Sequence, residues 1–98
     1  MKMPVTVSPE ATDDIEQAEA YFANLRAGLG AQFEDEVFRT LNKIGDMPLG
    51  FGIVSDGVRA LGLRRFGYVV YYRTDGTVTE VLAVIHGSQP PEVWQSRL

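Results

Sequence analysis

The stretch that decides the fold covers residues 58–87, which read VRALGLRRFGYVVYYRTDGTVTEVLAVIHG. Two dense runs within it, residues 68–72 and 81–85, are apolar and rich in β-branched and aromatic side chains. They flank residues 74–77, Thr-Asp-Gly-Thr, whose Asp-Gly pair suits the tight turn of a hairpin. The sequence therefore predicts an antiparallel β-hairpin at the centre of the protein.

Both predicted strands carry apolar side chains on both of their faces. An antiparallel sheet that is covered on one side only shows alternating apolar and polar residues, and these two runs do not. We therefore expect other parts of the molecule, or a partner, to cover both faces of the sheet.

Two amphipathic helices are predicted before the hairpin. Ser8, Pro9 and Glu10 form a helix start, with a capping hydroxyl, a proline at the first position and an acid in the first turn. Gly28 and Gly30 are expected to form the turn between the helices. The apolar residues of each helix recur every three or four positions: Ala11, Ile15, Ala18, Phe22 and Leu25, then Phe33, Val37, Leu41 and Ile44.

The predicted element order is β-α-α-β-β-β, with an edge strand at residues 5–7 and a further strand at 58–65. Turns are expected at Asp56-Gly57 and Phe66-Gly67. This order indicates an α+β fold, a helical hairpin packed on a small antiparallel sheet, and the length of 98 residues predicts a single domain, residues 1–98. Two helices cover only one face, so we hypothesise that a partner's segment fills an apolar groove on the sheet.

Charge and composition exclude several classes of function. The net charge is −4: residues 1–38 carry eight acids against two bases, and residues 39–98 carry seven bases against five acids. An acidic chain is poorly suited to binding long nucleic acid through its phosphates. Cysteine is absent, which excludes disulfides and thiolate chemistry. No motif indicates a cofactor or a metal, and no apolar run predicts a signal peptide or a membrane span, so we expect a cytoplasmic protein.

Several segments, taken in order, resemble one known superfamily. They are VTVSPEA at residues 5–11, GVRAL at 57–61, RFGYVVYYR at 65–73 and VLAVIHG at 81–87, with Trp94 near the end. Together they are similar to the RelE/ParE toxin superfamily, on the ParE-like side. The resemblance implies the toxin of a type II toxin–antitoxin system, of the kind associated with plasmid stabilisation, bound by an antitoxin whose C-terminal segment wraps it.

The superfamily includes two activities. ParE-like members act on DNA gyrase, whereas RelE-like members cut messenger RNA in the ribosome and are strongly basic. Metal-free RNA cleavage needs a base, an acid and cations around the phosphate, and the candidates in this chain are Arg65, Arg73 and His86. Ser88-Gln89 stands where the superfamily has a basic pair after the His-Gly motif, which weakens the nuclease interpretation.

The sequence thus favours a gyrase inhibitor that acts by protein binding, with a ribosome-dependent endonuclease and an inactive partner-binding module as alternatives. The same residues also have possible structural roles. Arg64 and Arg65 are solvated or form ion pairs with acids such as Glu80 in this interpretation. His86 caps or packs the end of its strand, and Trp94 anchors the last segment. The candidate partner-binding residues are Arg59, Arg64, Tyr68, Val70, Tyr72, Leu82, Val84 and Trp94.

Overall fold

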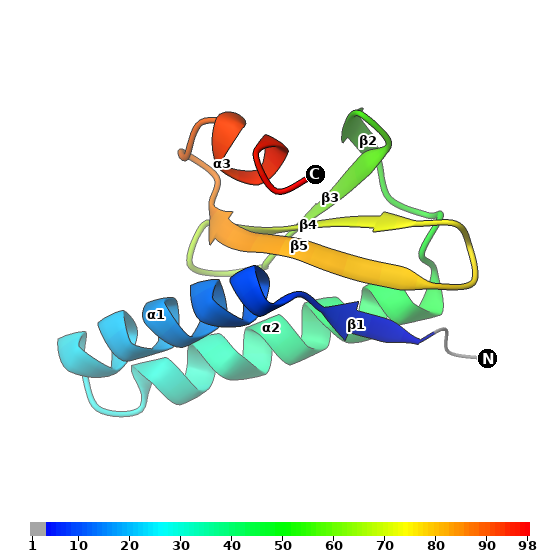
Figure 1. Ribbon diagram of the computed structural model, residues 1–98. Coiled ribbons are helices and arrows are strands. Elements are labelled where there is room, and N and C mark those ends of the chain that lie inside the picture. The colour runs from blue at the N-terminus through cyan, green and yellow to red at the C-terminus, as the bar shows by residue number, and fades with distance from the viewer. Residues whose placement is uncertain (1–3) are drawn as a thin grey trace.

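The computed structural model describes residues 4–98, so the first three residues of the predicted domain lie outside the described part. The elements are β1 (Val5–Val7), α1 (Pro9–Leu25), α2 (Leu29–Asp46), β2 (Ile53–Ser55), β3 (Val58–Gly62), β4 (Tyr68–Thr74), β5 (Thr79–His86) and α3 (Glu92–Gln95). The strands form one sheet in the order β1-β5-β4-β3-β2. Figure 1 shows α1 and α2 on one side of this sheet and α3 on the other. The predicted α+β fold class is confirmed.

The sheet differs from the expectation at both edges. β1 pairs with β5 in parallel, whereas all other neighbours are antiparallel, so the sheet is mixed. A parallel pair needs a long crossover connection, and the two helices and three strands between β1 and β5 provide it. The opposite edge is β2, which the sequence analysis missed because a strand of three residues is too short to show alternation.

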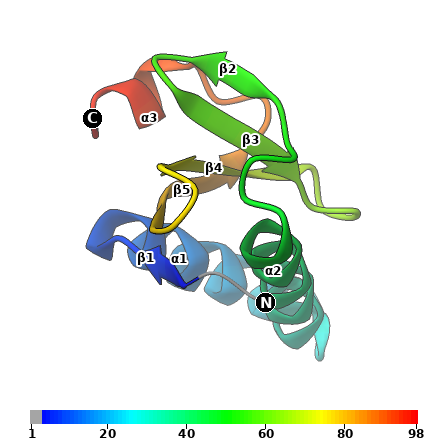
Figure 2. The same cartoon turned by 90° about the vertical axis from the view of Figure 1, so that its right-hand side faces the viewer.

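The turns follow from residues that adopt a left-handed backbone. Asp56 and Gly57, with φ of 52° and 75°, connect β2 to β3, as expected. Phe66 and Gly67 turn the chain into β4, also as expected, but β3 ends at Gly62 rather than at residue 65. Figure 2 shows that β2 and β3 curl away from the helices.

The central hairpin has a longer loop than the predicted tight turn. Thr74 pairs with Thr79, so residues 75–78 form the loop. Oδ1 of Asp75 accepts hydrogen bonds from the backbone N–H groups of Thr77 and Val78, both at 2.8 Å. These bonds favour the carboxylate and lower the pKa of Asp75 to about 2.

The helical hairpin forms largely as predicted. Oγ of Ser8 accepts a hydrogen bond from the Ala11 N–H at 3.1 Å and caps α1. Gly28 precedes α2 in a left-handed conformation, but Gly30 lies inside α2 rather than in the turn. A Cβ at Gly30 would lie 2.8 Å from the Glu19 carbonyl oxygen, so the glycine lets the helices approach closely. Leu25, expected to face inward, is exposed. None of the helices in residues 4–98 is long and apolar enough to cross a membrane.

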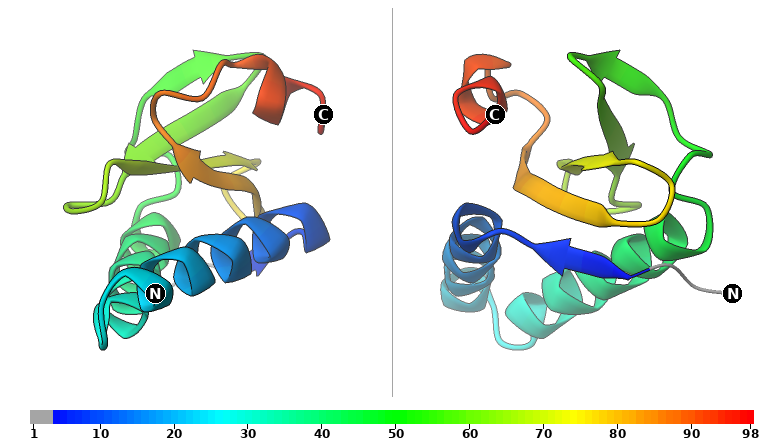
Figure 3. Two further views of the ribbon diagram at one scale, coloured as in Figure 1. Left: turned by 90° about the vertical axis from the view of Figure 1, so that its left-hand side faces the viewer. Right: turned by 45° about the vertical axis from the view of Figure 1, so that its right-hand side comes forward.

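The main core lies between the helical hairpin and the sheet. Phe22 of α1 and Phe33 of α2 pack around Phe66 and Tyr68, with ring centroids 4.8 to 5.9 Å apart. The strands contribute fully buried side chains to this core: Val70, Tyr72, Val81 and Val84. The left panel of Figure 3 shows both helices running beneath the sheet.

A smaller core covers part of the second face of the sheet. Trp94 of α3 is buried and stacks on Tyr71, with ring centroids 5.4 Å apart and planes at 18°. A β-bulge in β5 leaves Leu82 without a partner between the pairs Val81–Tyr72 and Ala83–Tyr71. Both Leu82 and Ala83 therefore reach the α3 side. This part of the second face is covered by the chain's own last helix, whereas the apolar residues Ile53 and Val54 of β2 are exposed.

Candidate functional site

The three candidates for RNA cleavage lie in two separate places. Arg65 and His86 are at the end of the sheet near the β3–β4 turn, whereas Arg73 is at the far end of β4. Arg65 donates a hydrogen bond to Oε1 of Gln32 at 3.0 Å, and its guanidinium lies 5.0 Å from the centre of the Phe66 ring. The fold therefore does not place Arg73 beside the other two side chains.

His86 is exposed, and its ring is held by Ser88 and Tyr68. Nδ1 accepts a hydrogen bond from the Ser88 N–H at 3.1 Å and lies 2.8 Å from the Ser88 hydroxyl oxygen. Nε2 faces Gly67, where an added Cβ would lie only 2.8 Å away, and the Tyr68 ring packs edge-on against the imidazole. Since Nδ1 accepts from a backbone donor, the neutral ring carries its proton on Nε2. Ser88 thus has a definite role as the partner of His86.

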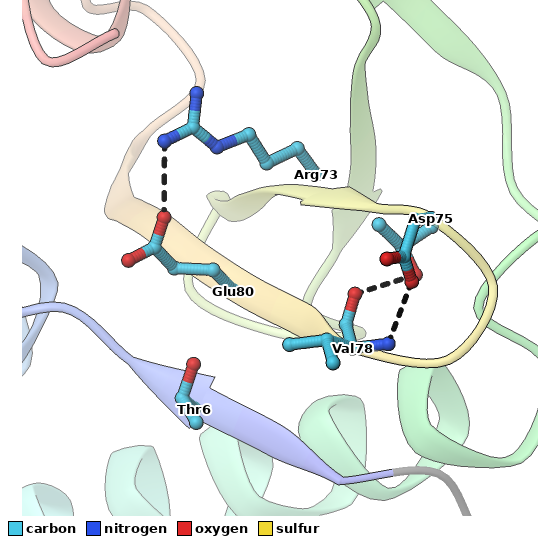
Figure 4. A pocket seen from close by; sticks show the side chains of 6 residues that line it. Thr6, Arg73, Asp75, Val78 and Glu80 are labelled. Atoms are coloured by element: carbon cyan, nitrogen blue, oxygen red, sulfur yellow. Dashed lines mark hydrogen bonds and ion pairs between the residues drawn. The ribbon is translucent and has the colours of Figure 1, made fainter.

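Arg73 lines an open hollow of about 480 Å³ between β1 and the β4–β5 hairpin. Figure 4 shows its side chain directed at Glu80, with Thr6 of β1 below, and the Arg73–Glu80 pair spans 3.2 Å. Arg73 is thus the partner of Glu80, whereas the sequence analysis had considered Arg64 and Arg65 for that role. Both members are about half exposed, so the pair contributes little to stability.

Val70, Tyr72 and Val84, which the sequence analysis placed in a partner groove, face the helices. Their side chains are fully buried in the main core, and the Tyr72 hydroxyl donates to the Pro48 carbonyl at 2.9 Å. Burial raises the pKa of Tyr72, an effect that Arg59 partly offsets. The folded chain presents none of these three side chains to a partner. Alternation along a strand shows that two faces exist but not which face the helices occupy.

The other candidate partner-binding residues lie in four settings. Leu82 and Trp94 are buried together on the second face, where Trp94 anchors the last segment. Tyr68 is partly buried beside His86, and burial raises its pKa. Arg59 donates to the carbonyls of Phe51 and Leu49, at 2.6 and 3.3 Å. Arg64 remains on the surface, where it pairs with Glu36.

Glu36 is a buried acid that the sequence analysis did not single out. Its side chain on α2 is 8% exposed, and Oε1 lies 3.3 Å from Arg64 and 3.6 Å from Arg39. Its other oxygen, Oε2, is buried and accepts no hydrogen bond from residues 4–98. A sequence signal does exist, because Glu36 falls three residues after Phe33 and so lies on the inward stripe of the helix.

Asp14 and Arg97 form the second charged pair that the sequence did not reveal. Arg97 contacts Asp14 through both terminal nitrogens, at 2.6 and 3.0 Å, and also donates to the Leu82 carbonyl at 3.0 Å. Oδ2 of Asp14 accepts from the Val84 N–H at 3.0 Å. The pair therefore satisfies backbone groups of β5 beyond the end of β1. The hydrogen bonds to Asp14 raise the pKa of Arg97.

A comparison with family models matched residues 5–91 to the ParE toxin of the type II toxin–antitoxin system parDE. The chain belongs to the ParE toxin family. The match covers the helical hairpin and the whole sheet of this ParE-family chain. A comparison with curated proteins found no match.

Two solved structures share the fold of this ParE-family chain. The chromosomal ParDE toxin–antitoxin system from P. aeruginosa aligns with a TM-score of 0.73 and 17% identity, over 87% of this chain and 96% of that one. The toxin–antitoxin complex RelBE2 from Mycobacterium tuberculosis aligns with a TM-score of 0.54 and 21% identity, over 88% of this chain and 99% of that one. At these identities the likeness shows the fold. The superfamily assignment made from the sequence is confirmed.

Proposed function

We propose that this toxin acts by binding a protein target, DNA gyrase, and that a cognate antitoxin neutralises it by binding the toxin in a hetero-oligomer. The observation that carries the proposal is the separation of Arg73 from Arg65 and His86. Cleavage of RNA without a metal needs its base, acid and cations around one phosphate. The net charge of −4 adds support, because a strongly basic surface is the usual means of binding RNA.

The environment of His86 bears on the same question. A general acid or base must reach the proton that it transfers. Here Nδ1 is bonded to Ser88, and Nε2 lies above Gly67 on an exposed ring. The bond to Ser88 gives Nδ1 a role in fixing the end of β5, and the variants tested below decide whether Nε2 transfers a proton.

The test is induction of the chain alone in bacteria, followed by two assays on purified protein. We expect viable counts to fall, DNA supercoiling by gyrase to be inhibited, and messenger RNA to stay intact in a translating extract. The Arg65→Ala and His86→Ala variants should keep their toxicity if they keep the fold. RNA cleavage that disappears in both variants would establish the endonuclease instead, and unchanged viability on induction would contradict the toxin and favour the inactive binding module.

The antitoxin part of the proposal has its own test. The protein encoded by the adjacent reading frame should form a complex with this chain in gel filtration and restore viability when both are induced. Absence of a complex between the two purified proteins would refute the pairing.

A further inference from the structure

Three arginines, Arg39, Arg64 and Arg65, gather where α2 meets the β3–β4 turn, and we call them the arginine triad. Arg39 and Arg64 share Oε1 of Glu36, and Arg65 is bonded to Gln32, one helical turn before Glu36. Figure 2 shows the β3–β4 turn lying above α2, on the side away from α1. The triad thus joins two segments that are distant in the sequence.

The geometry leaves the donors of the triad available to a ligand. A guanidinium carries five N–H donors in a planar fork that matches a carboxylate. The side chains of Arg39 and Arg64 are 47% and 59% exposed, although both meet Oε1 of Glu36, whose side chain is only 8% exposed. Glu36 therefore engages one terminal nitrogen of each guanidinium, and about half of each side chain faces solvent. An anion that arrives there meets cations that are already positioned.

The local charge is opposite to that of the molecule. Three arginines and Glu36 give +2 (3 − 1), whereas the whole chain carries −4. A long polyanion such as RNA would extend beyond the patch over a surface whose net charge is negative. A short acidic segment of a protein would meet the patch alone.

We propose that the arginine triad binds an acidic segment of the antitoxin, with carboxylates of that segment bonded to Arg39 and Arg64. The inference rests on the antitoxin pairing proposed above and names the chemistry of the contact. Charge complementarity at an exposed site acts mainly on the association rate and depends on salt. Binding through the triad should therefore weaken as salt is added.

The experiment measures the affinity of the purified adjacent-frame protein for four forms of the toxin at 50 and 500 mM salt. These are the wild type, Arg39→Ala/Arg64→Ala, Arg64→Lys and Arg73→Ala. Arg73 is a control for position, because it is also about half exposed and paired with one glutamate at 3.2 Å but lies at the far end of the sheet; its variant removes one charge, and the double variant removes two. Circular dichroism checks that each variant is folded.

We expect the double variant to bind about tenfold more weakly at 50 mM salt, with a smaller difference at 500 mM. Arg64→Lys should fall between the double variant and the wild type, since lysine keeps the charge but loses the planar fork. Arg73→Ala should bind like the wild type. Equal affinity of the wild type and the folded double variant would overturn the inference while leaving the antitoxin pairing intact. If Arg73→Ala weakened binding as much as the double variant does, the loss of affinity would come from net charge and not from the triad, and the inference would be wrong.

Two further outcomes would also overturn the inference. No binding by the wild type would refute the pairing itself, and the inference with it. A single-stranded RNA of 20 nucleotides serves as the competing ligand: if the free toxin binds it and the double variant does not, the triad is a nucleic-acid site and the inference is wrong.

Discussion

Arg97 and Asp14, 83 residues apart, meet over the open edge of β5 and satisfy two of its backbone groups. The guanidinium bonds to the Leu82 carbonyl and the carboxylate to the Val84 N–H, at the point where β1 no longer pairs with the strand. An unpaired edge strand is a template for pairing with other chains. The ion pair thus takes the place that a longer β1 would occupy.

We predict that Arg97→Ala lowers the free energy of unfolding by about 2 kcal/mol. Both partners are less than one-fifth exposed, and removal of Arg97 leaves the Asp14 carboxylate without its counter-charge and the Leu82 carbonyl without its donor. Urea denaturation followed by circular dichroism measures the change. Arg73→Ala is the control, with a loss of about 0.5 kcal/mol, because its ion pair is solvated. Similar losses in both variants would contradict the role given to Arg97.

Trp94→Ala should destabilise the chain by about 3 kcal/mol, the lower end of the range for truncation of a buried aromatic residue. The indole fills the smaller core and stacks on Tyr71. Because Trp94 is the only tryptophan, its emission should shift to longer wavelength when urea unfolds the protein. Leu98→Ala is the control, since Leu98 is about half exposed and should change stability by less than about 0.5 kcal/mol. A wild-type emission maximum typical of exposed indole would contradict the packing of α3.

Asp75 should make stability depend on pH in acid. Its pKa is about 2 in the folded chain, below the ordinary value of 3.8. The carboxylate therefore stabilises the fold above pH 4, and this contribution is lost as the pH falls through 2. We expect Asp75→Ala to be less stable than the wild type at pH 7 and the difference to shrink between pH 4 and 2, measured by urea midpoints. A difference that stays constant over that range would show that the loop bonds do not depend on the charge.

Gly30→Ala should destabilise the helical hairpin by about 1 kcal/mol. Alanine favours a helix by up to about 1 kcal/mol over glycine, but overpacking against a backbone oxygen 2.8 Å away costs about 1 to 3 kcal/mol. Gly52→Ala, in the loop before β2, is the control for an added methyl group without a contact, because a Cβ there meets no atom within 4 Å. Thermal unfolding of both variants gives the comparison. A higher melting temperature for Gly30→Ala would show that the helices can move apart at no cost.

Glu36→Met should leave the free energy of unfolding unchanged or raise it by about 1 kcal/mol. Replacement of a buried charge by an apolar side chain of similar volume is often neutral or stabilising, and Arg39 and Arg64 can turn to solvent. Asp35→Met removes the same charge from the exposed side of α2 and is the control for net charge. Urea denaturation measures both variants. A decrease of more than about 2 kcal/mol in the free energy of unfolding of Glu36→Met would show that Glu36 stabilises the fold rather than only positioning the triad.

The sequence predicted those parts of the fold that depend on local signals. The cap at Ser8 and the spacing of Ala11, Ala18 and Phe33 were sufficient to predict the helical hairpin, because capping and helical periodicity act within a few residues. The Asp56-Gly57 turn was equally local. The parallel pairing of β1 could not be predicted, since a strand of three residues contains no signal for the strand with which it pairs.

The candidate site was less predictable because its contacts join distant segments. Glu36 and Arg64 are 28 residues apart, and no local pattern links them. The stack of Trp94 on Tyr71 decided what covers the second face, and it likewise depends on the folded chain. Val70 and Val84 were assigned to a groove because alternation does not distinguish a face that meets helices from a face that meets a partner.

The parallel pairing of β1 also sets an order of events during protein synthesis. Val5 pairs with Thr79, so the first strand has no partner until 74 further residues have been made. At ribosomal rates of about 5–20 residues per second, this delay is roughly 4–15 s. The helical hairpin can form in that time, but its apolar face has no sheet to pack against. This face is therefore exposed to solvent, where chaperones can bind it. The sheet of the toxin can therefore be completed only after β5 has been made.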